Sequence, residues 1–573
     1  MNFMKKYFKG ILTTASIISI IFVIGWSTGL HCQNNKDLYS ETRRNIQIYG
    51  EIYKETFDHY VEDIDPEAFM RSGINGMLDK LDPYTVYLEK EGKENLKLMT
   101  EGKYYGVGMR ITIRNGWPTC AEQPFPNSPA QKAGIREGDQ IIEINGESTK
   151  GLSLNETASR LRGEEKGSKV TIKIRRVGIE KPIQMTLIRD EIVISDIQYK
   201  GMVEPGIGLI NLNVFNRGAA KQVRNALEEL LNQGMEALIL DLRGNPGGLL
   251  DVAVDVASNF LNEGELVVYT KGRSADRNKE YHTSGTPIFS SMPLVILVNQ
   301  YSASASEIVA GAVQDLDRGV VIGTETFGKG LVQSVIPLDR RGEKQLKMTT
   351  AKYYLPSGRL IQRPEVFERG KGSVFLDTGS DSSETDSVNH ESYYTENGRR
   401  VRGGGGVKPD IKSKNPKTTR YVSMLRYKSM FFNFSLKYAA DHEDLSRDFE
   451  VDDEMLDTFF EFVDENDFDY KPAGMAELDS LENIAKNKDY SDQFIEHLGN
   501  VRKQFESVEK EDREESIDDI KYMIKRELTA KLFGNDASYV TSFKRDETLQ
   551  EAVSLLKEKQ RYENILTPNS EGN

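Results

Sequence analysis

The sequence predicts an α/β protein of several domains, in which a layered α/β core follows a mostly β module and precedes a helical region. Three observations support this prediction. Buried strands alternate with helices from Ile207 to Pro337, short alternating strands fill about Tyr104 to Arg189, and helical periodicity dominates beyond Pro409. With 573 residues the chain is too long for one hydrophobic core, so separate domains are expected.

The first segment, residues 1–35, predicts a membrane anchor or a signal. An uncharged run from Ile11 to Leu30 is long enough to cross ~30 Å of hydrocarbon as a helix. Lysines precede this run, and because positive charge stays in the cytoplasm, we expect a protein anchored in the inner membrane with its catalytic part in the periplasm or otherwise extracytoplasmic. A cleaved signal peptide, or a lipoprotein cleaved before Cys32, is the alternative.

Two regions separate this segment from the core. Residues 36–92 carry apolar side chains at helical spacing, as at Ile46, Tyr49 and Tyr53, and predict a small helical region. Residues 93–190 predict a compact β module, because the side chains of 170–174 alternate and the pair Asn145-Gly146 is typical of a hairpin.

The predicted core spans residues 191–412. Strands are expected at Ala237 to Leu240, Leu294 to Val298 and Val320 to Ile322, and Gly234 is placed to end the helix before the first. Residues 377–396 are acidic, carry no Lys or Arg and are rich in Ser and Thr, which predicts a flexible loop within this region.

The last region, residues 413–573, predicts charged helices, with one apolar face through Ile520, Ile524 and Leu528 before Gly534. It matches no general family pattern. Three roles are open for it: homo-oligomerisation, docking of the β module, or binding of an adaptor protein.

Charge and cysteine content exclude two classes of function. A formal net charge of −14 argues against nucleic acid as a partner, because phosphate binding needs a concentrated basic surface. Cys32 and Cys120 are too few and too far apart for a disulfide framework or a cysteine metal site. We expect neither a metal nor another cofactor.

Ser304 is the first candidate for chemistry. It follows the predicted strand 294–298 and precedes an apolar helix face, so it lies near a helix N-terminus, where free N–H groups can stabilise an oxyanion. The structural alternative is a capping box formed with Glu307, which the serine taken alone favours.

Lys329 is the second candidate, in a glycine-flanked turn just past a buried strand. A lysine acts as a base only when neutral, so burial must lower its pKa from ~10.4. The run from Gly323 to Lys329 also resembles a phosphate-binding loop. That interpretation fails because Gly330 stands where a Ser or Thr would bind magnesium. In addition, the pattern of 331–337 predicts a strand, where a phosphate-binding loop requires a helix.

Three segments together resemble the carboxyl-terminal processing, or tail-specific, serine proteases: 302–308 around Ser304, 326–333 around Lys329, and the glycine-rich loop Asp241 to Gly248. The resemblance covers about residues 45–412. It implies a crotonase-like core, Ser304 as nucleophile, Lys329 as general base and Gln333 as the residue that orients the lysine. It also implies an oxyanion hole from the backbone of Ala305 and of Gly247 or Gly248.

Spacing agrees with one of these roles, because residues four apart in an extended strand lie on one face, and an amide at 333 could then hold the amine of Lys329. The β module resembles a PDZ domain inserted before the core. That resemblance implies a peptide-binding loop that holds a substrate's terminal carboxylate, formed by Tyr105, Gly106, Val107, Gly108 and Met109.

We therefore predict a serine endopeptidase that cleaves envelope proteins near their C-termini through a Ser304 acyl-enzyme. Its expected partners are proteins with free, apolar C-termini, and the membrane through the N-terminal segment. Two other classes are weighed: a non-catalytic PDZ-bearing sensor or scaffold that binds unfolded tails, and acyl-thioester chemistry on a crotonase-like fold.

Overall fold

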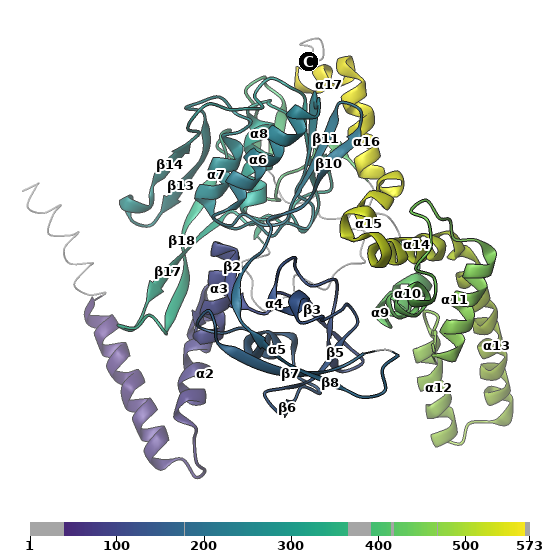
Figure 1. Ribbon diagram of the computed structural model, residues 1–573. Helices are drawn as coiled ribbons and strands as arrows, with labels where there is room; N and C mark the ends of the chain where they lie inside the picture. The colour runs from purple at the N-terminus through teal and green to yellow at the C-terminus, as the bar shows by residue number, and fades with distance from the viewer. Residues whose placement is uncertain (1–38, 177, 365–390, 414–417, 467, 568–573) are drawn as a thin grey trace, which may run out of the picture. The chain divides into compact units, whose positions relative to one another are not determined.

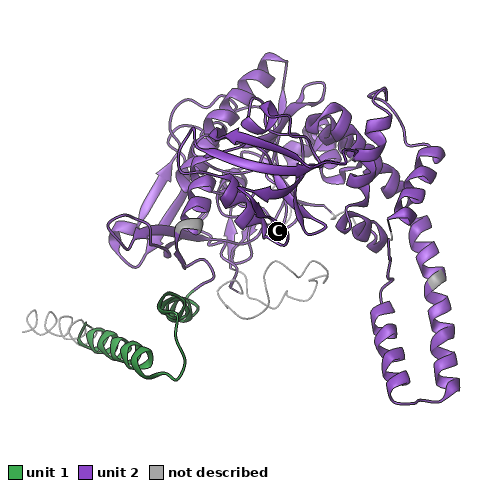
Figure 2. Cartoon of the chain, turned by 60° about the horizontal axis from the view of Figure 1, so that its bottom comes forward, with its two compact units in different colours: residues 1–81 green, residues 82–573 purple. Residues whose placement is uncertain are grey.

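The structure is a computed structural model that describes residues 39–176, 178–364, 391–413, 418–466 and 468–567. The chain forms two compact units, residues 1–81 and 82–573, coloured separately in Figure 2. The predicted membrane segment lies outside the described residues. Within the described ranges, no helix has both the length and the apolar character needed to span a membrane.

The described part of the first unit is helical, as predicted for this region. Residues 39–59 form one helix and α2, Pro66–Leu78, the second. Asp65 caps α2 by accepting hydrogen bonds from the N–H groups of Glu67 and Ala68, and Pro66 occupies the first helical position. The rings of Tyr53 and Phe69 pack at 5.3 Å between the two helices.

The mostly β module of the second unit confirms the alternation predicted around 170–174. Val170, Ile172 and Ile174 are buried, while the residues between them are less so. The antiparallel sheet follows the order β3-β4-β5-β7-β8, and β2 pairs with β9. The elements are α3 (Lys90–Glu101), β2 (Lys103–Gly106), β3 (Ile111–Arg114), β4 (Trp117–Cys120), α4 (Pro129–Lys132), β5 (Gln140–Ile144), β6 (Glu147–Ser148), α5 (Leu154–Leu161), β7 (Lys169–Arg175), β8 (Ile183–Ile188) and β9 (Asp190–Val193).

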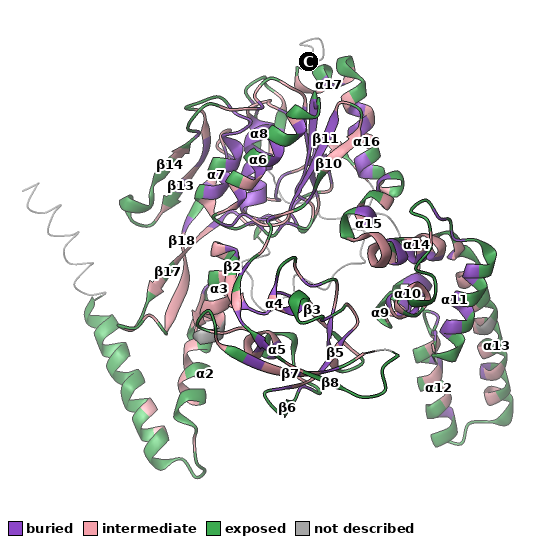
Figure 3. Cartoon of the chain, viewed as in Figure 1, coloured by how far each residue is buried: buried purple, intermediate pink, exposed green. Residues whose placement is uncertain are grey.

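A six-stranded sheet, parallel from β11 onward, forms the core in the order β10-β11-β12-β15-β16-β21. Its central strands are buried on both faces, which explains their continuous apolar sequences (Figure 3). All three strands predicted by sequence are confirmed, two of them one residue longer. The strands are β10 (Ile197–Glu204), β11 (Ile207–Leu212), β12 (Ala237–Asp241), β15 (Leu294–Val298), β16 (Val320–Gly323) and β21 (Ile411–Lys412).

Different helices cover the two faces of this sheet (Figure 1). α6 (Ala219–Asn232), α7 (Leu250–Ala257) and α8 (Ala305–Asp315) pack on one face. The last helices of the chain, α16 (Glu547–Lys557) and α17 (Lys559–Leu566), pack on the other. These two helices therefore belong to the hydrophobic core, although the sequence pattern placed them in a separate helical region.

A second sheet lies beside the core and contains β1 (Val86–Leu88), β18 (Gln345–Tyr354), β13 (Leu266–Gly272) and β14 (Lys279–His282), with β17 (Leu331–Pro337) paired to β18. The strand predicted at 331–337 is confirmed with the same bounds.

Most of the predicted acidic loop falls outside the described residues. Where the structure describes its end, the prediction of a flexible loop is wrong, because Ser392–Tyr394 forms β19 and pairs with β20, Arg400–Arg402. Pairing of the backbone orders this stretch despite its polar composition.

Four of the remaining helices, over residues 420–465 and 517–533, share an aromatic core around Phe431, Phe434 and Phe459. The last of them contacts the β module, since Lys531 of α14 forms a buried ion pair with Glu137. Of the roles left open by the sequence, docking of the β module is therefore the one that the structure shows. The helices are α9 (Arg420–Tyr427), α10 (Met430–Asp441), α11 (Asp453–Glu465), α12 (Met475–Asn487), α13 (Asp492–Glu515) and α14 (Ile517–Phe533), followed by α15 (Asn535–Thr541).

Candidate active site

Ser304 lies between β15 and α8, directly before the first helical residue. Its φ of 56° falls in the left-handed region, which is costly for a residue other than glycine. Both flanks are held to the carbonyl oxygen of Asn245, which accepts hydrogen bonds from the N–H of Ala303 at 3.0 Å and from the hydroxyl of Ser306 at 2.9 Å. The surrounding backbone therefore stabilises a strained serine at a helix N-terminus.

Glu307 joins the segments of the two candidate residues. One carboxylate oxygen accepts hydrogen bonds from the N–H groups of Ser304 (2.8 Å) and Lys329 (2.9 Å). The other oxygen accepts from the N–H of Gly328 at 2.7 Å and from the hydroxyl of Thr326 at 2.6 Å. Burial raises the pKa of Glu307 to about 6, while these four donors favour its charged form. Ser304 and Glu307 therefore form the capping box that the sequence indicated. The same carboxylate also fixes the turn that carries Lys329.

The side chain of Lys329 lies in an environment that favours the neutral amine. Its Nζ is 4.4 Å from the centre of the Tyr84 ring. Burial, and then the positive charge of Lys347, lower the pKa of Lys329 to about 8, against the opposing influence of Glu307 and Asp82. A lysine base requires a lowered pKa, and burial lowers the pKa of Lys329 in this structure.

Tyr353 of β18 links the same two segments from the opposite side. Its buried hydroxyl contacts the carbonyl oxygen of Ser304 at 3.2 Å and also that of Lys329. Neither Tyr353 nor Tyr84 was singled out as a site residue from the sequence. Both lie within residues 45–412, the range that the family resemblance covers, and that was the available signal.

The glycine-rich loop packs directly against Ser304. A Cβ added at Gly247 would lie 2.8 Å from the Cβ of Ser304, so only glycine allows this approach. The N–H of Gly247 already donates to the side chain of Asn245 at 2.9 Å. Among the described residues, the N–H groups of Gly248 and Ala305 form no backbone hydrogen bond. Of the two glycines offered by the sequence, Gly248 is therefore the one with a free donor.

Gln333 lies in β17, but Lys329 precedes that strand by two residues, so the argument from strand alternation does not extend to it. The hydrogen bond that the structure shows for the Gln333 amide runs to the hydroxyl of Thr349 at 3.4 Å, and Thr349 in turn donates to Asp82 at 3.1 Å. Contact with the amine of Lys329 stays a prediction.

The predicted peptide-binding loop borders a mostly apolar cavity of about 210 Å³. Its lining includes Val107, Met109, Phe125 and Leu161, together with Arg110 and Arg162. The side chains of Val107 and Met109 are buried in the β module. Within the described part of the chain, the N–H groups of residues 107–109 lack hydrogen-bond partners. Tyr105 and Gly106 instead lie in β2, and their backbone groups take part in its pairing with β9.

Comparison with known proteins agrees with this arrangement. A peptidase family S41 model matches residues 206–369, and a PDZ domain model matches 122–176. The carboxy-terminal-processing protease of Bartonella bacilliformis is 35% identical over 360 residues, which cover 62% of this chain and 79% of the relative. The chain belongs to the carboxyl-terminal processing protease family. It is thus a serine-type peptidase, and the alternative of a non-catalytic sensor is set aside.

Two other proteins are similar to this protease. The carboxyl-terminal-processing protease of Synechocystis sp. is 42% identical over 293 residues, which cover 50% of this chain and 66% of the relative. The solved structure of a photosystem II D1 C-terminal processing protease has 30% identity and a TM-score of 0.33, covering 63% of this chain and 86% of that one.

Two further family models match the ends of the protease. The N-terminal domain of the activating protease CtpB matches residues 27–92. A model described as a probable PDZ-protease C-terminal helical domain matches residues 421–556. The expectation that the last region follows no general family pattern is therefore wrong. The match was not predicted because the amphipathic helices of this region contain no residue-specific motif.

Replacing Glu307 by glutamine is expected to lower peptidase activity at least ~100-fold, because an amide NH₂ would face N–H donors and displace the segments of Ser304 and Lys329. Glu156 provides a matched control, since it forms the same type of capping box with Ser153 at the exposed N-terminus of α5. Glu156→Gln should retain wild-type turnover of a peptide substrate. Equal turnover by the two variants would contradict this account of Glu307.

Proposed function

We propose that this protease is an endopeptidase that cleaves envelope proteins near their C-termini, with Ser304 as nucleophile and Lys329 as general base. The observation that carries the proposal is the joint attachment of both segments to Glu307, beside a lysine whose pKa is lowered to about 8. We also propose the crotonase-like arrangement for the core, in which β12 and β15 present the glycine-rich loop and Ser304 at the same sheet edge.

The reaction follows from these groups. The Ser304 hydroxyl attacks the scissile carbonyl carbon while the neutral amine of Lys329 takes its proton. The N–H groups of Ala305 and Gly248 stabilise the oxyanion that forms. When the C–N bond breaks, protonated Lys329 gives its proton to the leaving amine and an ester remains on Ser304. Water, deprotonated by Lys329, then attacks the ester and releases the new C-terminus.

The β module selects substrates by their C-terminal residues. A terminal carboxylate fits the free N–H groups of Val107, Gly108 and Met109, since charge-assisted hydrogen bonds to backbone donors are strong. An apolar last side chain fits the cavity beside them, which Phe125 and Leu161 line. Substrates with free, apolar tails are therefore preferred over substrates with blocked tails.

A reporter protein with a flexible tail tests this function. With three apolar residues at a free C-terminus, we expect cleavage near the tail, mapped by mass spectrometry. The same reporter with a C-terminal amide should be cleaved ~10–100-fold more slowly in kcat/KM, because each lost charged hydrogen bond costs about 1.5–3 kcal/mol. A third reporter ending in three serines should also be a poor substrate, because it buries little apolar surface in the cavity. Equal rates for all three would refute tail selection.

Extracytoplasmic location is part of the proposal and rests on the apolar run from Ile11 to Leu30 behind a basic N-terminus. Fractionation of cells that produce the full chain, combined with protease accessibility from the outer side, tests it. Recovery of the protein in the cytoplasmic fraction would refute it.

A further inference from the structure

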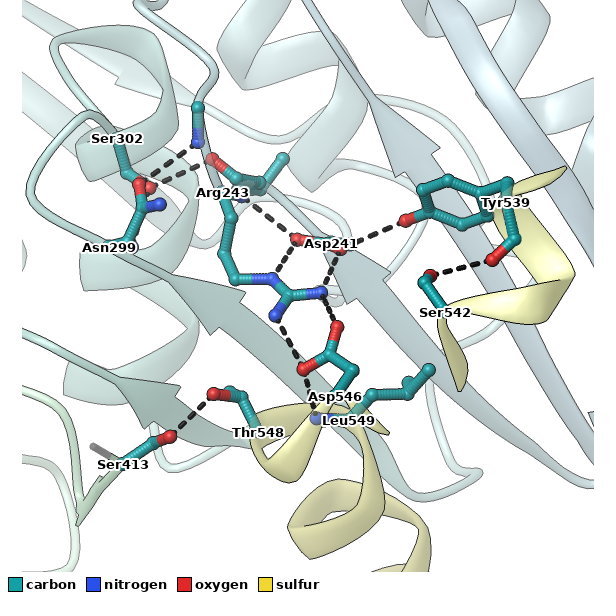
Figure 4. Close-up of polar contacts among 12 residues, drawn as sticks. Asp241, Arg243, Asn299, Ser302, Ser413, Tyr539, Ser542, Asp546, Thr548 and Leu549 are labelled. Carbon is teal, nitrogen blue, oxygen red and sulfur yellow. Dashed lines mark hydrogen bonds and ion pairs between the residues drawn. The ribbon is translucent and has the colours of Figure 1, made fainter. Parts of the chain in front are cut away.

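We propose that Asp546 is a positioning residue of this protease: from the C-terminal helices it holds Arg243 and, through Arg243, the loop Asp241–Gly248 beside Ser304. The proposal rests on the proposed function, in which this loop contributes a donor to the oxyanion hole. Figure 4 shows the contacts, with Asp546 and Tyr539 coming from the yellow C-terminal helices and Asp241 from the end of β12.

Arg243 is bound on two sides. Its Nε and one terminal nitrogen donate to the two carboxylate oxygens of Asp241, at 2.9 and 2.7 Å. Its two terminal nitrogens donate to the two oxygens of Asp546, at 2.8 and 2.6 Å. A planar guanidinium that makes bidentate contacts with two carboxylates has a defined orientation.

The cluster is partly buried and therefore little screened by solvent. The side chains of Arg243 and Asp546 are 22% and 20% exposed, and that of Asp241 is 2% exposed. The two carboxylates raise the pKa of Arg243 even though burial alone would lower it, so the guanidinium stays charged. Tyr539 of α15 adds a hydrogen bond from its hydroxyl to Asp241 at 3.2 Å.

The backbone that follows Asp241 reaches Ser304 through short contacts. The hydroxyl of Ser302 donates to the carbonyl of Leu242 at 2.8 Å. The carbonyl of Asn245 accepts the N–H of Ala303 and the hydroxyl of Ser306, on either side of Ser304. A displacement of Arg243 would therefore move both the donor at Gly248 and the segment that carries the nucleophile.

Asp546 is itself fixed by the fold. It is the N-cap of α16, where its side chain accepts the N–H of Leu549 at 3.0 Å. α16 packs on the core sheet through Leu549, Ala552 and Val553. Since the carboxylate both caps a helix and binds Arg243, the two roles must be separated in a test.

Asp546→Asn separates them, because asparagine caps helices as well as aspartate does but lacks the charge that binds Arg243. Asp452→Asn is the matched control: Asp452 is also an N-cap, of α11, and accepts the N–H of Met455 at 2.9 Å. The full-length variants are compared for kcat and KM on one peptide substrate. Rates are divided by the active-site concentration, titrated with a fluorophosphonate.

We expect Asp546→Asn to lower kcat ~10–100-fold with KM within about twofold, because a small misplacement of catalytic groups costs up to ~100-fold. Asp452→Asn should retain the wild-type kcat. Equal kcat in both variants, or a loss in Asp546→Asn that disappears on division by titrated sites, would overturn the inference. A Ser304→Ala variant that keeps activity would instead refute the proposed function, so the two failures are distinguishable.

Discussion

Replacing Ser304 by alanine is expected to lower kcat at least ~10⁴-fold, the largest single loss among the changes considered for this protease. The substitution removes the attacking oxygen, and loss of a catalytic serine typically costs up to ~10⁶ in kcat. It leaves the backbone contacts intact, since the N–H of Ser304 binds Glu307 and its carbonyl accepts from Tyr353. The protein should therefore remain folded.

Ser258→Ala is the control for this experiment. Ser258 is a buried serine of the same core, and its hydroxyl donates to the carbonyl of Val254 in α7 at 2.9 Å. Its turnover should stay within about threefold of wild type, because its hydroxyl bonds the carbonyl of Val254 and the N–H of Ser284, and neither residue belongs to the candidate site. Both variants are measured by peptide hydrolysis and by labelling with a fluorophosphonate. Retention of labelling in Ser304→Ala would show that another residue is the nucleophile.

Replacing Lys329 by arginine or methionine is expected to lower kcat at least ~10³-fold. General-base catalysis contributes about 10²–10⁴-fold, and neither replacement can accept a proton at working pH. Only the neutral amine is reactive, so wild-type kcat/KM should fall about tenfold per pH unit as the pH drops below about 8, and level off above it.

Lys347→Met provides a matched test of the cause of that lowered pKa. The positive charge of Lys347 is the second contribution, after burial, that lowers the pKa of Lys329. Removing it should move the midpoint of the pH profile to higher pH and leave the plateau rate unchanged. A midpoint that stays in place would show that burial acts alone, and a flat profile in the wild-type enzyme would contradict the assignment of Lys329 as base.

The strands of the core could be predicted closely because they are buried on both faces. Leu294 to Val298 has no polar residue, and a glycine or polar turn bounds each such run. The face of a helix is less informative, since it shows that a partner exists without identifying it. For that reason α16 and α17 were expected in a separate helical region, whereas they cover one face of the core sheet.

The candidate site also has residues that the sequence identified and contacts that it did not predict. Sequence motifs were sufficient to find Ser304, Lys329 and the glycine-rich loop, because those residue types occur close together in short segments. Glu307 was interpreted as a cap since its only visible partner, Ser304, lies three residues away. Its contacts to Gly328 and Lys329 span 21 and 22 residues, and no local pattern encodes them.

The sequence by itself thus determined the α/β fold class and the order of the β module and the core, and it supplied the candidate residues for acyl transfer, whose roles stay predictions. Only the tertiary structure decided that Gly248 has the free N–H, that Lys329 is buried enough to favour its neutral amine, and that Asp546 binds Arg243 across 303 residues. The physical reason is that hydrogen-bond partners and desolvation depend on what surrounds a group in space, and those neighbours come from distant parts of the chain.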